Sequence, residues 1–448
     1  MKKYPTSPLA IDGMPPGVPF IIVNEAAERF NFYGLQAILL VFMTDHLLGS
    51  NGQLETLSKG QAMYYYHLFI SAVYFFPFVG GIISDAFLGK YRTILYLSLV
   101  YCAGSVALAV DSTRFGLLTG LALVAIGSGG IKPCVSALVG DQFGARNSHL
   151  MSRVYGWFYF SINFGSSVSM LLTPWFLERF GPRVAFGVPG IFMLMATLVF
   201  WLGRHRFVRI GPSGMGFVRE TFSLVGLRSV GQVAVVYTLV AMFWALYYQT
   251  GSAWVLQAKQ MNCRWLGVDW LPSQMQAANP FLVLGLIPLF SYVLYPALGR
   301  LWPLTPLRKI GLGLFLTVPS FLLPVWLEWQ IGHGIKPSIG WQFVCYVLLS
   351  AAEVMVSITS LEFAYTQAPK KMKSLVMSLY LLSMSLGNVF TAAIEFFIQN
   401  PDGTSKLAGP NYYLFFAGLM LATAVVFVFY ALTYKEKVYL QDEPGITG

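Results

Sequence analysis

The chain has 448 residues, of which 56% are hydrophobic and only 11% are charged, whereas soluble globular domains carry about 25% charged residues. Its apolar residues come in blocks of about twenty, long enough to cross a hydrocarbon core about 30 Å thick. This composition excludes an ordinary soluble enzyme and indicates a protein that crosses a membrane many times. The formal charge of +10 does not indicate a nucleic-acid partner, because the basic residues form no aromatic-interleaved patch and show no zinc or helix-turn-helix spacing.

Apolar windows bounded by charged or turn residues predict an all-α membrane protein with twelve transmembrane helices. The first predicted span is too long for a signal peptide, so we expect the amino terminus to be retained. In chain order, the predicted spans are residues 18–48, 62–84, 94–112, 116–140, 153–177, 184–203, 232–258, 276–300, 306–328, 341–367, 375–399 and 412–433.

Lys and Arg are distributed unequally between the two sides of this topology. With the amino terminus inside, 19 of the 29 basic residues fall in inner segments and 8 in outer loops, and Arg29 and Lys132 remain within spans. The positive-inside rule therefore predicts that both termini are cytoplasmic. We expect a multi-pass protein of the plasma (cell inner) membrane. The longest inner loop follows the sixth span, which predicts an N-terminal six-helix bundle (1–203), a cytoplasmic linker (204–231), and a C-terminal six-helix bundle with a short cytoplasmic tail (232–448).

Charged residues at membrane depth cost several kcal/mol unless they are paired or hydrated, so each is a functional candidate. Glu25, Glu28 and Arg29 fall on one face of the first span, because positions three and four residues apart are neighbours on a helix. Lys132, beside Pro133, lies about sixteen residues into the fourth span, and we expect a glutamate of the first span to be its partner. The alternative for both groups is that the charges snorkel to an interface.

Further ionisable residues in the predicted spans are also candidates, among them three glutamates and a histidine. Glu353 and Glu362 are nine residues apart and therefore on opposite sides of one helix. Glu353 lies near mid-membrane, so we expect it to be the better substrate ligand. We expect Glu362 to pair with a neighbouring helix or to form part of a gate. Glu395 lies near the outer surface, where we expect a plain interfacial role. His67 is suited to proton binding near neutral pH, but a membrane histidine is as often a packing residue.

These segments together resemble the proton-dependent oligopeptide transporter family of the major facilitator superfamily. The resemblance extends over nearly the whole chain, and its motifs occur in the family's order. The matching segments are Glu25-x-x-Glu28-Arg29 (the proton-coupling motif of helix 1), Gly130-Ile131-Lys132-Pro133 (helix 4), Phe158-Tyr159-x-x-Ile162-Asn163 (helix 5), Gly81-x-x-x-Asp85 (the inner loop after helix 2) and Leu361-Glu362-Phe363 (helix 10).

The resemblance implies a symporter that imports di- and tripeptides with protons, as two six-helix bundles rock around a central site. It implies no cofactor or metal beyond the transported proton, no partner other than peptide, proton and membrane lipid, and function as a monomer. The implied residues are Glu25, Glu28, Arg29 and His67 for the proton; Arg29 and Lys132 for the peptide carboxylate; Glu353 for its amino group; Asn163 and Asn279 for its backbone; Tyr33, Tyr74 and Trp244 for its side chains; and Asp85 and Glu362 for gating or structure.

The sequence departs from the family pattern at helix 7, where Tyr248 stands in place of an acidic residue. A phenol cannot titrate as a carboxylate does near neutral pH, so either proton handling lies with His67 and the span 1 glutamates or coupling is weak. Two other functions remain as alternatives. Uptake of nitrate or another anionic solute is disfavoured by Glu353, which would repel an anion. An intramembrane enzyme is disfavoured because no metal or nucleophile motif occurs.

Overall fold

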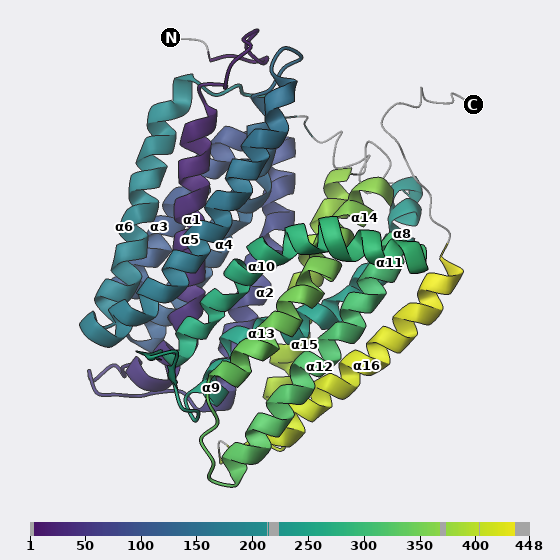
Figure 1. The fold of residues 1–448 in the computed structure, drawn as a ribbon. Coiled ribbons are helices and arrows are strands. Elements are labelled where there is room, and N and C mark those ends of the chain that lie inside the picture. Colours follow the sequence, from purple (N-terminus) through teal and green to yellow (C-terminus); the bar gives the residue numbers. More distant parts are fainter. Residues whose placement is uncertain (1–3, 213, 215–223, 368–372, 403, 435–448) are drawn as a thin grey trace.

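The computed structural model is almost entirely helical (Figure 1). It describes the chain except for residues 1–3, 213, 215–223, 368–372, 403 and 435–448, and it also leaves undescribed the side chains at 152, 224–230, 232, 364–367 and 373–377. The predicted cytoplasmic tail and much of the predicted linker therefore lie outside the described residues.

The first six spans pack together as one bundle, on the left of Figure 1. Glycines let two of its helices approach closely, because a Cβ on Gly127 of the fourth helix would lie 2.7 Å from Tyr101 of the third. Single π-helical turns extend the first helix to His46 and the second to Leu88. The helices are α1 (Val18–Val41), α2 (Lys59–Ile83), α3 (Lys90–Val110), α4 (Arg114–Asp141), α5 (Met151–Phe180) and α6 (Pro182–Leu202).

The second bundle contains six further spans, of which three are interrupted helices. A 3-10 turn at Tyr248–Gly251 joins α8 to α9, and π-helical turns at Phe290–Leu294 and Val354–Ile358 join α10 to α11 and α13 to α14. The helices are α8 (Leu224–Tyr247), α9 (Ala253–Ala258), α10 (Ala278–Leu289, preceded by a 3-10 turn at Pro272–Ala277), α11 (Tyr295–Leu301), α12 (Pro306–Gly332), α13 (Gly340–Glu353), α14 (Thr359–Gln367), α15 (Lys373–Ile398) and α16 (Pro410–Thr433).

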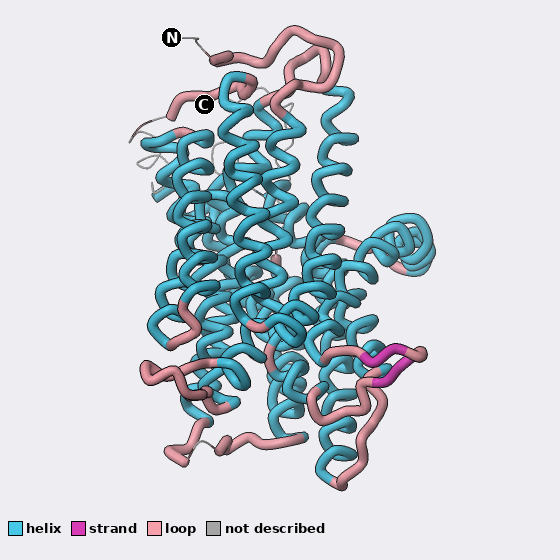
Figure 2. Tube along the Cα trace, turned by 90° about the vertical axis from the view of Figure 1, so that its left-hand side faces the viewer, coloured by secondary structure: helices cyan, strands magenta, loops and turns pink. Residues whose placement is uncertain are grey.

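The twelve predicted spans each correspond to one of these helical segments, with boundaries that differ by a few residues. One boundary was wrong by more: α8 begins at Leu224, inside the predicted linker, because residues 224–231 contain no proline to stop the helix. Outside the helices, β1 (Arg264–Trp265) pairs antiparallel with β2 (Val268–Asp269). Figure 2 shows this hairpin in magenta at the right-hand side, in the lower half of the molecule.

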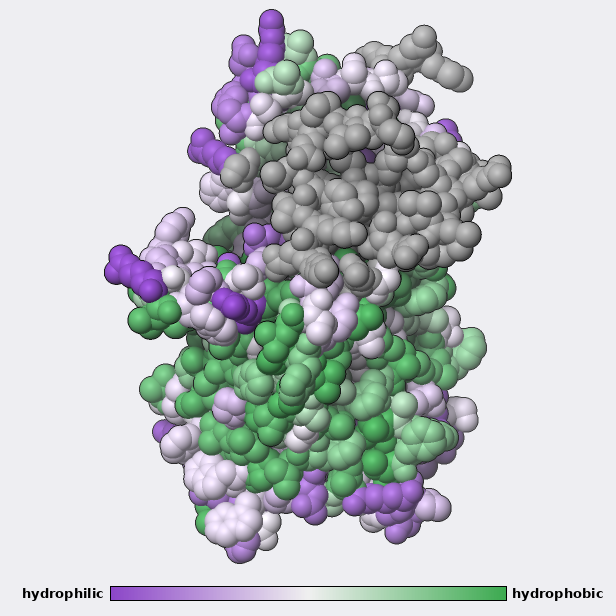
Figure 3. Space-filling view, turned by 90° about the vertical axis from the view of Figure 1, so that its right-hand side faces the viewer, coloured by the Kyte–Doolittle hydropathy of each residue, from purple (hydrophilic) through white to green (hydrophobic). Residues whose placement is uncertain are grey.

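Ten segments of the described structure are long and apolar enough to cross a membrane. The helices α1 and α5 are not among the ten, and α1 carries Glu25, Glu28 and Arg29 within its length. Figure 3 shows a broad apolar band over the face of the C-terminal bundle, bordered by polar side chains at its lower end. This band is the surface that a lipid bilayer would cover.

Polar contacts join the two bundles toward the end that is away from the start of α1 and the end of α16. Lys259 Nζ, after α9, lies 2.6 Å from Asp45 Oδ2, after α1. Gln399, after α15, donates a 2.7 Å hydrogen bond to Ser58, which caps α2. Nearer the middle of the helices, the Ser71 and Ser385 hydroxyls are 2.9 Å apart. The bundles are therefore held together on the side that the positive-inside rule makes the outer side.

Candidate functional site

A pocket of about 160 Å³ lies between the two bundles, near the middle of the predicted spans. Both bundles contribute to its wall, and most of the lining side chains are aromatic or carry a neutral polar group. The lining residues are Tyr33, Gln36, Tyr74 and Met170 from the N-terminal bundle, and Trp244, Tyr247, Tyr248, Thr250, Gln276, Asn279, Glu353, Ser357 and Met384 from the C-terminal bundle.

Glu353 is the one acidic residue in this wall. It ends α13, at the point where a π-helical turn begins, and such turns are frequent at functional sites. Its Oε2 accepts a 2.6 Å hydrogen bond from Asn279, whose amide also bonds Ser350 and accepts from Tyr247. Within the described part of the chain, Glu353 forms no ion pair. A carboxylate held only by neutral donors is ready to accept an ammonium group.

On the N-terminal side, two cations and two carboxylates form a buried cluster. Arg29 Nε lies 2.7 Å from Glu25 and 3.2 Å from Glu28, and Lys132 Nζ lies 3.5 Å from Glu28. Both carboxylates are at most 2% exposed. The structure thus pairs Lys132 with a glutamate of the first helix, as expected, and the formal charges of the cluster sum to zero.

Aromatic rings separate this cluster from the pocket. Lys132 Nζ lies 4.1 Å from the centre of the Phe32 ring and 5.5 Å from that of Tyr74, distances at which a cation is attracted to an aromatic face. Tyr74 is part of the pocket wall, whereas Arg29 and Lys132 are not. The cations therefore stand behind the wall, so a ligand's negative end would reach them only after a small movement of these rings.

The opposite wall is an aromatic corner on α8 and the turn that follows it. The rings of Trp244 and Tyr247 lie 5.3 Å apart, and Tyr248 packs 5.9 Å from Trp244 and 5.6 Å from Tyr74. The Tyr248 hydroxyl points to Met384 Sδ at 3.9 Å, a weak acceptor. Tyr248 thus fills the place expected for an acidic residue with a packing group at the contact between the bundles.

His67 lies at the contact between the bundles and outside the pocket wall. It is fully buried. Its Nδ1 is 2.8 Å from Asn388 Oδ1 and its Nε2 is 2.8 Å from Ser252 Oγ. Because Asn388 Nδ2 is bonded to a backbone carbonyl, the neutral ring is expected to donate to Asn388 and to accept from Ser252. Both readings of His67, proton site and hydrogen-bonded packing residue, are compatible with this geometry.

The other predicted residues lie away from the pocket. Asn163 is buried and donates a 2.9 Å hydrogen bond to the carbonyl of Tyr159, one turn back on its own helix. Asp85 is in the turn after α2, and Glu362 is exposed on α14. The expectation for Glu395 was wrong: it is only 1% exposed, because the start of α16 covers it and Tyr412 donates a 2.6 Å hydrogen bond to it.

Sequence reasoning missed several residues of the wall, among them Tyr247 and Gln276. Tyr247 adjoins Tyr248, and a helix places it three residues from Trp244, on the same side. That spacing was the sequence feature that could have placed Tyr247 in the wall. Gln276 lies in the 3-10 turn before α10, where no helical periodicity indicates which way a side chain points.

The model of the POT family matches residues 91–227 and 221–412. Peptide transporter family 1 of Drosophila melanogaster is 37% identical over 71% of this chain and 48% of its own length. Solute carrier family 15 member 2 of Homo sapiens is 34% identical over 80% of this chain and 55% of its own. The chain therefore spans about half the length of the curated relatives it matches.

Solved structures give the same family over nearly the full chain. The crystal structure of the POT family transporter PepTSo is 37% identical with a TM-score of 0.86, over 94% of this chain and 99% of that one. An auto-inhibited POT family peptide transporter is 35% identical with a TM-score of 0.85, over 96% and 99%. These relatives are transporters by name, so nothing in them favours the alternative of an intramembrane enzyme. The chain belongs to the POT family of transporters, with the family's twelve-helix major facilitator superfamily fold.

Proposed function

We propose that the chain is a proton-coupled symporter that imports di- and tripeptides by alternating access. The observation that carries the proposal is the placement of opposite charges around one pocket. Glu353, which forms no ion pair with any described residue, lies in the wall, and the cations Arg29 and Lys132 lie behind the Tyr74 ring of that wall. A zwitterion a few residues long requires opposite charges at the two ends of one cavity. The names of the relatives, which are peptide transporters, support the same substrate class.

In this proposal the peptide ammonium binds Glu353, and Asn279 keeps the carboxylate oriented through its 2.6 Å hydrogen bond. The peptide carboxylate is drawn toward Lys132 and Arg29, and Tyr33, Tyr74 and Trp244 form a wall that tolerates many side chains. The pocket of about 160 Å³ is smaller than the roughly 300–1,000 Å³ typical of ligand sites. A tripeptide therefore requires the bundles to move apart around the pocket. Asn163 would contact the peptide backbone only after a similar movement.

Charge balance provides the coupling. The cluster of Glu25, Glu28, Arg29 and Lys132 is neutral before a peptide arrives, so an added carboxylate would leave one buried negative charge in excess, which is costly at membrane depth. A proton on Glu28 restores neutrality and releases Lys132, which lies 3.5 Å from it. Peptide and proton binding are then mutually favourable, which is the thermodynamic requirement for symport.

His67 fits a second step of the same cycle. A protonated ring can donate to both Asn388 Oδ1 and Ser252 Oγ, because the serine hydroxyl can turn from donor to acceptor. These partners belong to the C-terminal bundle and His67 to the N-terminal one. Protonation would therefore strengthen the contact between the bundles and favour closure on the outer side, to which the Asp45–Lys259 pair also contributes. In this account both termini are cytoplasmic and a monomer in the plasma membrane is the working unit.

A weakly coupled transporter of peptides or of an anionic solute is the second candidate. Tyr248 favours it, because its hydroxyl points to Met384 Sδ and a phenol cannot exchange a proton near neutral pH as a carboxylate does.

Uptake of labelled dialanine into proteoliposomes, with and without an imposed inward proton gradient, tests the proposal. We expect accumulation above the outside concentration only with the gradient, with unaltered dipeptide inside. Across 100 mV one proton is worth about 2.3 kcal/mol, enough for a peptide gradient of about 50-fold. Equal uptake with and without the gradient would refute coupling, and uptake of nitrate in place of dialanine would refute the substrate.

A further inference from the structure

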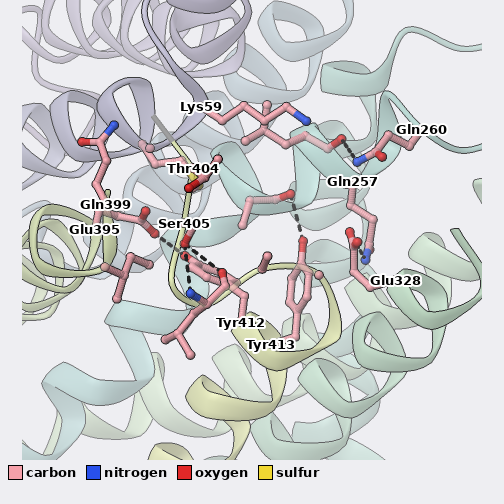
Figure 4. Close-up of a pocket in the computed structure, with 18 residues that line it drawn as sticks. Lys59, Gln257, Gln260, Glu328, Glu395, Gln399, Thr404, Ser405, Tyr412 and Tyr413 are labelled. Atoms are coloured by element: carbon pink, nitrogen blue, oxygen red, sulfur yellow. Dashed lines mark hydrogen bonds between the residues drawn. The ribbon is translucent and has the colours of Figure 1, made fainter. Parts of the chain in front are cut away.

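A second pocket, of about 300 Å³, opens at the outer end of the C-terminal bundle (Figure 4). It shares no lining residue with the central pocket. Its floor is formed by α9, α12, α15 and α16, and the start of α2 completes it from the N-terminal bundle with Lys59, Gly60 and Met63. The pocket is therefore assembled only when the two bundles are in contact on the outer side.

The buried side of this pocket is rich in hydrogen-bond acceptors. Glu395 is 1% exposed, and its polar partner is the Tyr412 hydroxyl at 2.6 Å. Glu328 accepts a 3.1 Å hydrogen bond from the amide nitrogen of Gln257. Among the described residues, neither carboxylate forms an ion pair. Figure 4 shows the two carboxylates on opposite sides of the pocket.

Gln257 indicates independently that the pocket could accept a hydrogen-bond donor from a ligand. The side chain is 1% exposed and lines the pocket. Its amide nitrogen is bonded to both Pro324 O and Glu328, but its Oε1 accepts no hydrogen bond from any described residue. An unsatisfied buried acceptor is destabilising, so a ligand with several N–H donors would gain from binding beside it.

The remaining wall is mostly apolar, with Met63, Leu256, Ile398 and Tyr413 among its members, and Lys59 is its one cation. A metal ion is a poor match, because no group of three or more His, Cys, Asp or Glu side chains converges anywhere in the described structure. We propose that this pocket binds a small amphipathic primary amine, with its ammonium group at the Glu395 side and its apolar body against the apolar wall.

Binding of the amine in this pocket should affect the transport cycle, an inference that rests on the proposed function. The pocket includes the start of α2, where Ser58 accepts the 2.7 Å hydrogen bond from Gln399 of the C-terminal bundle. A ligand that bridges this contact binds only the state closed on the outer side, and therefore stabilises it. The amine should slow transport without competing with peptide at the central pocket.

Phenethylamine is a suitable probe, because it combines a primary ammonium group with a compact apolar ring. We expect calorimetric titration of the full chain in detergent to detect its binding, and 2-phenylethanol, which lacks the charge, to bind at least tenfold more weakly. Glu395→Gln keeps an acceptor for Tyr412 and should weaken amine binding about tenfold or more, since hydrogen bonds to charged groups contribute about 1.5–3 kcal/mol. Glu328→Gln provides the same test should Glu395→Gln fail to fold.

Two controls locate the amine. Glu178→Gln, an exposed residue at the end of α5, should leave binding unchanged. Glu353→Gln removes the other carboxylate that could attract an ammonium group, and binding that depends on Glu395 should remain in this variant. Amine affinity that is lost in Glu353→Gln, or that neither Glu395→Gln nor Glu328→Gln weakens, would overturn the proposal. In proteoliposomes, phenethylamine in the outer solution should lower the maximal rate of dialanine uptake without raising KM. A purely competitive effect would also overturn the proposal. Because calorimetry requires no transport, failure of the proposed function would leave the binding result standing.

Discussion

Replacement of Glu353 by Gln removes the one negative charge from the wall of the central pocket and changes little else. Glutamine has nearly the same shape, and its amide oxygen can still accept the 2.6 Å hydrogen bond from Asn279. In the proposed complex the loss is one charge-assisted hydrogen bond to the peptide ammonium, worth about 1.5–3 kcal/mol. Since each 1.4 kcal/mol is a factor of ten, dialanine should bind about 10- to 150-fold more weakly.

The assay is equilibrium binding of dialanine and of its des-amino analogue, N-propionyl-alanine, to the wild type and to Glu353→Gln. The analogue lacks the ammonium, so it should bind the wild type weakly and should lose no further affinity in the variant. Glu178→Gln, the same chemical change at an exposed site, serves as the matched control. Equal losses for both ligands in Glu353→Gln would refute the assignment of the amino group to this residue, because the substitution would then act on the pocket as a whole.

Three further predictions test coupling and gating. Glu28→Gln should retain counterflow exchange of dialanine but lose accumulation driven by a proton gradient, since the neutral amide mimics a permanently protonated Glu28; full accumulation, with exposed Glu55→Gln as the control, would contradict this. His67→Gln should flatten the dependence of uptake on pH, since glutamine cannot bind a proton, and an unchanged profile would show that His67 is a packing residue. Asp45→Asn removes the partly exposed partner of Lys259, an interaction worth about 0.2–1 kcal/mol. The reporter is Gln36→Cys in a Cys263→Ser background, labelled by an impermeant thiol reagent added on the outer side. Asp45→Asn should raise the rate of this labelling up to about fivefold, and an unchanged rate would exclude Asp45 from the outer gate.

The sequence was sufficient for the twelve spans and the pairing of Lys132 with the first helix. Both follow from the free-energy cost of exposing backbone polar groups or charges to hydrocarbon. This cost leaves few other arrangements of the spans and of the buried charges. Lys132 must be neutralised at membrane depth, so a glutamate of the first span could be expected as its partner, but the choice of Glu28 over Glu25 comes from the structure. The segment in the described structure that departed most from its predicted boundary, the start of α8, is a place where no such cost applies.

The composition of the pocket wall could be predicted only in part. Tyr33, Tyr74, Trp244, Asn279 and Glu353 line it, but helix rotation and tilt are set by packing between helices. A single helix gives no information about them. For this reason the family pattern does not indicate that aromatic rings separate Lys132 from the pocket.

The burial of Glu395 also depends on packing between helices and could not be predicted from the sequence. Its position near the end of a span suggested an interfacial side chain, yet the next helix in the chain covers it, and Tyr412 bonds it. The contact depends on how α16 packs against α15, which no local pattern in either segment encodes.

The central claim is that one pocket holds a peptide between opposite charges, and a structure of the full chain with bound dialanine tests it most directly. The account predicts density for the dipeptide in the central pocket, with its ammonium within about 3 Å of the Glu353 carboxylate and its carboxylate directed toward Lys132 and Arg29. Dialanine bound in the reverse orientation, or bound without contact to Glu353, would contradict the account.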